Sequence, residues 1–322
     1  MGGFLLRRLA AALLVLLLVL TATFFLLHLA PGDPTRLLAD PRVPRAQREH
    51  LLHLYGLDRP PHLQYLGWLR GVVLAGDWGV SFAHQRPVAV VLAEALPPTL
   101  LLAGASLVLT YVLALALGVV AARRRGLADG VIRVVSLVLY SLPVFWVGLM
   151  AILLFSVRWP LLPASHMRSV GAEAWPAVAR LLDLGRHLAL PTLVLALVSA
   201  GGVARFVRGA LLEAFGQEHL RAARARGLAE RRIVWRHALR NAAPALVQLV
   251  GLHLPFLLGG ALVVEVVFAW PGVGRLTYDA ILARDVPLVL AATALSGALV
   301  VAGSLFADLL HAAIDPRLRD GR

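Results

Sequence analysis

Ionisable side chains occur inside or next to long apolar runs of this chain, where a charge is costly unless it has a role or a partner. His253 lies within one such run, and Glu265 and Asp308 lie near the ends of two others. Arg317 and Arg319 follow Asp308, so we expect Asp308 to form a structural ion pair. Glu265 stands where an apolar run ends, which makes it a candidate for the outer gate of a membrane pathway.

The residue types in this chain give little support for catalysis or metal binding. All 31 basic residues are arginine and no cysteine is present, which excludes a phosphate-binding loop with its lysine, lysine Schiff bases, disulfides and cysteine-ligated metals. His50 and His53 are three residues apart, a spacing that metal sites use, but no further ligand is evident nearby and a solvated helix face is the simpler interpretation. Ser296 lacks the sequence context of a serine nucleophile. We expect no catalytic residue, and no metal or cofactor bound by this chain.

The composition is that of a membrane protein. Hydrophobic residues make up 59 % of the 322 residues and charged residues 15 %, whereas soluble domains have about 45–50 % and about 25 %. The net charge of +13 does not indicate nucleic-acid binding in so apolar a chain, because arginines between membrane spans set the orientation and attract anionic lipid.

Six apolar runs are long enough to cross a hydrocarbon core of about 30 Å. They lie near residues 9–29, 99–122, 134–157, 188–204, 245–268 and 286–310. The first run is longer than the apolar part of a signal peptide, so we predict a retained span. Arginine is roughly twice as dense in segments 1–8, 123–133, 205–244 and 311–322 as in the other connections, which predicts both termini in the cytoplasm. The predicted fold is all-α and polytopic, in the inner (plasma) membrane, with six transmembrane helices.

Two polar intervals separate these runs. Residues 31–98 are broken by prolines, and their apolar spacing is typical of short amphipathic helices in an external loop or cap. The interval 205–244 carries nine arginines, and Gly216 and Gly227 divide it into two or three predicted helices. One helix runs from Glu218 to Gly227, where a residue without a Cβ adopts the left-handed helix end at least cost. A second begins near Leu228 and uses Ile233, Trp235, Ala238 and Leu239 for packing.

The helix before Gly227 has the composition of a docking surface. Ala222, Ala223 and Ala225 would form a face narrow enough to enter a groove on a partner protein, and arginines at its rim would form charge-assisted hydrogen bonds. The rim residues are Arg221, Arg224 and Arg226. The pattern alone is equally consistent with an arginine-rich cytoplasmic loop that binds no partner.

The segment Ala222-Ala223-x-x-x-Gly227, with a helix behind it, resembles the cytoplasmic EAA loop of permease subunits in binding-protein-dependent ABC importers. Arg221 stands where the general motif has glutamate. The variant R-x-A-R-A-x-G followed by WRHALRNA (235–242) is instead similar to the dipeptide, oligopeptide and nickel branch. Further stretches that resemble this branch are LHLAPGDP (27–34), YGLDRPPHLQYLGWLRG (55–71), GDWGVSF (76–82), LPPTL (96–100), FLLGGALVVEVVFAWPGVGRL (256–276), DAILARDVPLV (279–289) and IDPRLR (314–319).

This resemblance implies a type I ABC importer permease fold, in which residues 1–30 form a first span, 31–98 the cap, 99–313 the transmembrane core and 314–322 a cytoplasmic tail. It also implies a second, similar permease subunit, two ATPase subunits that hold ATP and Mg, and an external substrate-binding protein. The ATPases would dock on the residues around Gly227, namely Glu218, Arg221, Ala222, Ala223, Arg224, Ala225, Arg226 and Gly227.

The cargo implied by the resemblance is a di- or oligopeptide, or a similar small solute such as a nickel chelate or glutathione. It would cross the inner membrane of a bacterium or archaeon by alternating access. The alternative is an ATPase-independent secondary transporter, a class that tends to have repeated halves and ion-binding acids at the middle of the membrane. The sequence has no repeat at a fixed period and few such acids.

Overall fold

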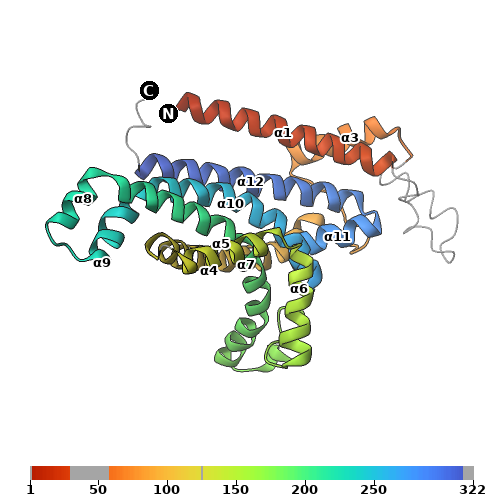
Figure 1. Ribbon diagram of the computed structural model, residues 1–322. Coiled ribbons are helices and arrows are strands. Elements are labelled where there is room, and N and C mark those ends of the chain that lie inside the picture. The colour runs from red at the N-terminus through yellow and green to blue at the C-terminus, as the bar shows by residue number, and fades with distance from the viewer. Residues whose placement is uncertain (1, 30–57, 125, 315–322) are drawn as a thin grey trace. The chain divides into compact units, whose positions relative to one another are not determined.

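Apolar sequence in a hydrocarbon environment favours helices, because a helix satisfies its backbone hydrogen bonds internally. The computed structural model describes residues 2–29, 58–124 and 126–314, and over these ranges the chain is helical with one isolated bridge between Val80 and Pro87 (Figure 1). The elements before the arginine-rich interval are α1 (Gly2–Leu29), α3 (Pro61–Arg70) with a π-helical end (Gly71–Ala75), α4 (Val88–Arg123), α5 (Leu127–Ser141), α6 (Val144–Ile152) with a π-helical end (Leu153–Arg158), a 3-10 turn (Ala172–Ala174) and α7 (Ala177–Gly216). Those that follow are α8 (Glu218–Ala225), α9 (Glu230–Arg232), a π-helical segment (Ile233–Ala238), α10 (Leu239–Val267), α11 (Val273–Ala283) and α12 (Val286–Ile314).

Within the described residues, four helices are long and apolar enough to cross a membrane. They are α1 over Leu9–Leu29, α4, α7, and α12 over Val286–Phe306. A fifth crossing results if α5 and α6 form one span, although their axes differ by 99°. The predicted total of six is therefore not confirmed. The remaining predicted run, 245–268, falls on α10, a helix of 29 residues whose side chains over 251–260 are outside the described part.

The helices do not coincide with the predicted apolar runs. The run 134–157 is broken at Pro143, which has no N–H and disfavours helical backbone in the residue before it. Leu142 is accordingly extended, with ψ at 137°. Pro191, in contrast, lies inside a continuous α7. The helix α4 begins at Val88 rather than near residue 99, and α7 begins at Ala177 rather than near residue 188. Each helix therefore extends about ten residues before the apolar run that it contains.

The described residues form two compact units. The first comprises residues from 1–99 and 271–301. In its core, the start of α4 packs against α11 and the start of α12, and Thr99 Oγ1 accepts a hydrogen bond from the Val273 N–H at 2.8 Å. Asp285, which is fully buried, accepts hydrogen bonds from Ser81 Oγ at 2.5 Å and from the Ala83 N–H at 3.0 Å. These bonds hold the loop around Ser81 to the start of α12.

The second unit comprises residues from 100–270 and 302–322, and α7 is its most extensively packed helix. Gly201 lets α7 approach α5 closely, because a Cβ there would collide with the backbone oxygen of Ser136. Near the start of α7, Asp183 accepts hydrogen bonds from the Ser169 N–H at 2.9 Å and from Ser169 Oγ at 2.7 Å. The loop before α7 is thus tied to its first turns.

Candidate functional site

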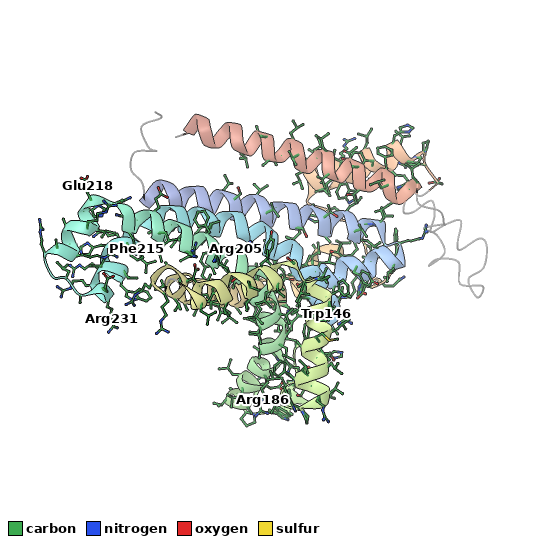
Figure 2. The ribbon with its side chains drawn as sticks, viewed as in Figure 1. Trp146, Arg186, Arg205, Phe215, Glu218 and Arg231 are labelled. Carbon is green, nitrogen blue, oxygen red and sulfur yellow. The ribbon has the colours of Figure 1, made fainter. Side chains whose placement is uncertain are left out.

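The arginine-rich interval contains the short helices α8 and α9, as the sequence predicts in part, but residues 205–216 belong to α7 and residues 239–244 to α10. The long helix α7 ends at Gly216, α8 follows at once, and α9 leads through the π-helical segment directly into α10. The helices α8 and α9 lie at the left of Figure 1. Glu218, Arg231 and Phe215 are labelled there in Figure 2. Residues 217–238 therefore form an ordered helical turn between two long helices.

The end of α8 is closed by a glycine in the left-handed conformation. Gly227 has φ at +76°, its N–H donates to the Arg224 carbonyl at 2.9 Å, and the Leu228 N–H donates to the Ala223 carbonyl at 3.2 Å. This pair of bonds is the Schellman arrangement, which satisfies carbonyls that the helix leaves unpaired. The predicted helix and the predicted role of Gly227 in ending it are confirmed.

A single side chain of α8 is buried. Leu220 has no exposed surface and belongs to a core cluster that joins α7 to the start of α10. The buried partners in that cluster include Val207, Leu211 and Ala214 of α7, and Ile233, Val234 and Ala238 of the π-helical segment. Leu220 was not among the residues predicted to pack, although it is the only large apolar residue between Gly216 and Gly227.

The packing predicted after Gly227 is partly wrong. Ile233 and Ala238 are buried and Leu239 packs against the same cluster, but the side chain of Trp235 is 57 % exposed. The π-helical turn is wider than an α-helical one, so Val234 lies on the buried side in place of Trp235.

A polar contact also ties α8 to α10. Asn241 Nδ2 donates to Gln217 Oε1 at 3.1 Å, and it lies 2.9 Å from His219 Nε2. Gln217 immediately precedes α8, so the start of the helix is held by polar groups and its middle by Leu220. No local pattern in the sequence indicates this contact, because its partners are 22 and 24 residues apart.

The outer surface of α8 presents charged and small residues. Glu218, Arg221, Ala222, Ala225 and Arg226 are exposed. Ala223, which was predicted to share a face with the other two alanines, is half-buried against the core cluster. Arg224 is engaged within the interval, because its Nε donates to Glu230 Oε1 at 2.7 Å and its guanidinium lies 5.1 Å from the centre of the Phe215 ring.

One ion pair fixes the part of α7 that precedes α8 to α5. Arg208 Nε and Nη2 donate to the two carboxylate oxygens of Asp129 at 2.6 and 2.7 Å, a bidentate geometry. The side chain of Asp129 is 9 % exposed, and Arg133 approaches it at 3.5 Å. The two partners are 79 residues apart, so no local pattern indicates the pair.

Comparisons with known proteins identify the class of membrane protein. The family described as the binding-protein-dependent transport system inner membrane component matches residues 114–320, and its companion family for the N-terminal part matches residues 1–103. The chain belongs to this family. It is therefore a permease of a transport system in the inner membrane, and it is not itself the enzyme of that system. The resemblance found in the sequence is confirmed.

The similar proteins span the whole chain. An oligopeptide transport system permease protein of Bacillus subtilis is 36 % identical over 320 residues, which cover 99 % of each chain. A dipeptide transport system permease protein of Escherichia coli is 34 % identical over 334 aligned positions, with 98 % of each chain covered. A glutathione transport system permease protein of Salmonella choleraesuis is 36 % identical, again over 99 % of each chain. The permease is of the ABC importer type, and the alternative of a secondary transporter is not supported.

The other residues that the sequence marks as candidates lie away from α8 or outside the described part of the structure. Glu265 is fully buried near the end of α10, where its backbone carbonyl accepts a hydrogen bond from the Trp270 N–H at 2.8 Å. A role for Glu265 in a gate stays a prediction. His50 and His53 lie outside the described residues, as do the side chains of His253 and Asp308. Among the described residues, no group of three or more histidine, aspartate or glutamate side chains could hold a metal ion.

Proposed function

We propose that this permease forms half of the membrane pathway of an ATP-driven peptide importer, and that α8 is the element on which a separate ATPase subunit acts. The observation that carries the proposal is the anchoring of α8. Its outer surface is polar and exposed, while its one buried side chain, Leu220, joins the end of α7 to the start of α10. A force applied to α8 therefore reaches the ends of two long helices at once.

The exposed face of α8 suits a groove on a folded partner. Ala222 and Ala225 add little bulk, and Arg221 and Arg226 offer charge-assisted hydrogen bonds to acidic groups at the rim of such a groove. Arg224 is already held by Glu230, so it stiffens the interval rather than reaching outward. The competing interpretation, a loop without a partner, requires none of this internal support.

The proposed orientation places both termini and α8 in the cytoplasm, with six spans. The count is reached when α10 crosses the membrane and α5 with α6 forms one broken span. The higher arginine density around α8 supports this orientation. The chain has no cysteine, so a single introduced thiol reports on one position. Val170→Cys, at a fully exposed position, should react with an impermeant maleimide in intact cells, and Ala225→Cys only after permeabilisation.

The proposed partners follow from the transport class. A second, similar permease completes the pathway, two ATPase subunits hold ATP and Mg, and an external binding protein delivers the cargo. The three similar proteins named above carry oligopeptide, dipeptide and glutathione in their names, so we assign peptides as the cargo class. The buried Glu265, near the end of α10 away from α8, remains the proposed outer gate residue.

The proposed mechanism is alternating access driven from α8. When the ATPases close on ATP, α8 moves, and α7 moves with it through Leu220. The ion pair of Asp129 with Arg208 and the close approach at Gly201 hold α5 against α7, so both helices reorient together. The pathway then opens to the opposite side of the membrane.

Co-purification tests the proposal. Ala222→Trp adds bulk to the exposed face of α8, and it should reduce recovery of the ATPase subunits with the tagged permease by about tenfold, the loss expected from one disrupted central contact. Val178→Trp makes a comparable change at an exposed site near the other end of α7 and should leave recovery unchanged. Equal recovery with both variants would refute α8 as the ATPase contact.

A further inference from the structure

The first unit contains a cavity of about 230 Å³ that the transport function does not explain. Its walls come from the end of α1, from α3, from the loop around Val80 and from the start of α12. These segments are held together by a cluster in which Phe24 and Tyr65 pack with Leu290, and by the contact of Thr21 Oγ1 with the Tyr65 hydroxyl at 2.8 Å. The walls of the cavity are therefore held in place by side-chain packing and by a hydrogen bond.

The position of the cavity along α1 places it at the edge of the hydrocarbon layer. The apolar stretch Leu9–Leu29 is long enough to span the membrane, and Phe24 and His28, which line the cavity, lie in its last two turns. At 1.5 Å per residue, Phe24 is about 8 Å from the end of that stretch. The cavity thus extends from the headgroup level into the region of the acyl chains.

The lining is apolar, with polar groups that mostly donate hydrogen bonds. Trp68 Nε1 is buried and has no hydrogen-bond partner in the described part of the chain. Arg59 also lines the cavity, and no aspartate or glutamate is among the described residues that do so. His28 is used internally, because its Nδ1 lies 2.9 Å from the Phe24 carbonyl and its Nε2 lies 3.4 Å from Gln64 Oε1.

We propose that this cavity binds an anionic phospholipid of the surrounding membrane. An acyl chain fits the aromatic and aliphatic walls around Phe24 and Trp68. Arg59 supplies the charge opposite to that of an anionic headgroup. The apolar walls together with the Arg59 guanidinium favour a ligand with an apolar tail and a negative charge over a purely apolar one. The inference rests on α1 crossing the membrane, and is independent of the cargo and of the ATPase contact.

Gly67 offers a matched pair of variants. It lines the cavity from the middle of α3, and a Cβ built there meets open space. Gly67→Leu should fill the cavity, whereas Gly67→Ala leaves most of it open and favours the helix. Native mass spectrometry of the complete transport complex, purified and incubated with phosphatidylglycerol or phosphatidylcholine, measures the bound lipid. We expect at least tenfold less bound phosphatidylglycerol with Gly67→Leu than with Gly67→Ala, at equal melting temperatures.

The contribution of the Arg59 charge to lipid preference is tested with separate variants. Arg59→Gln should reduce the preference for phosphatidylglycerol over phosphatidylcholine by about fivefold, the effect of one basic residue near a lipid surface. Arg70→Gln, on α3 but not lining the cavity, should leave the preference unchanged. The proposal would be overturned if both Gly67 variants retained equal amounts of phosphatidylglycerol, or if the wild-type protein bound the two lipids equally. Displacement of the lipid by a dipeptide would also overturn it. None of these results depends on transport activity.

Discussion

Replacing Leu220 with alanine removes the buried side chain that holds α8 in place. Leu220 is completely buried, whereas the other residues of α8 are exposed or half-buried. Truncating a buried leucine to alanine costs about 2–5 kcal/mol. The loss acts on the docking of α8, so the equilibrium between docked and undocked helix shifts by roughly 30-fold at the lower end of that range. An eight-residue helix is unstable alone in water, so undocked α8 unfolds.

Hydrogen exchange of the purified transporter measures this shift directly. The amides of α8 in Leu220→Ala should exchange at least about 30-fold faster than in the wild-type protein, with α7 little affected. ATP hydrolysis by the assembled complex should respond less to the binding protein and peptide. Val178→Ala, at an exposed position near the other end of α7, should change neither quantity. Unchanged exchange over Glu218–Ala225 in Leu220→Ala would refute the anchoring argument.

Three further predictions concern the helices that support α8. Gly201→Ala should lower the free energy of unfolding by about 1–3 kcal/mol, because the new Cβ collides with the backbone of α5. Gly209→Ala, on the same helix but facing open space, is the control and should raise the free energy of unfolding by up to about 1 kcal/mol. Both are measured by thermal unfolding in detergent. Gly227→Ala should cost about 1 kcal/mol because φ is +76°, and it should appear as faster hydrogen exchange in α8. Asp129→Asn should lower the melting temperature. Adding Arg208→Gln to that variant should lower it little further, because the two substitutions remove the same ion pair. A second decrease of equal size would contradict the pairing.

Much of the helical framework follows from the sequence. Apolar runs long enough to cross a membrane can form only helices or closed barrels in lipid, and the Ala- and Leu-rich composition favours helices. Gly227 was predicted as a helix end for a local reason, the low cost of a left-handed residue without a Cβ, and the structure confirms it.

Other features of the fold depend on the surroundings of a residue. Pro143 breaks the helix, whereas Pro191 lies inside α7, although both are prolines in apolar runs. Neighbouring groups decide whether the backbone atoms freed by a proline are satisfied, and a single sequence does not give those neighbours. The same limit applies to the roughly ten residues by which α4 and α7 extend before their apolar runs.

The composition of the candidate site was predicted from the sequence, but the contacts that hold α8 and its neighbouring helices in place were not. The exposed arginines and alanines of α8 are evident from the sequence. The contact of Asn241 with Gln217 and the ion pair of Asp129 with Arg208 join residues far apart in the chain, so they have no local signature. Ala223 and Trp235 were assigned to the wrong surfaces, because a turn of π-helix and the docking of α8 change which positions face the core.

Site-directed cross-linking tests most directly whether an ATPase subunit acts on α8. A benzophenone maleimide attached to Ala222→Cys would be the only such label on this cysteine-free chain. The same label at Val170→Cys serves as the control. After illumination of the assembled transporter, we predict an adduct between residue 222 and an ATPase subunit, and none from residue 170. An adduct of residue 222 with the external binding protein, or no ATPase adduct in a complex that hydrolyses ATP, would contradict the account.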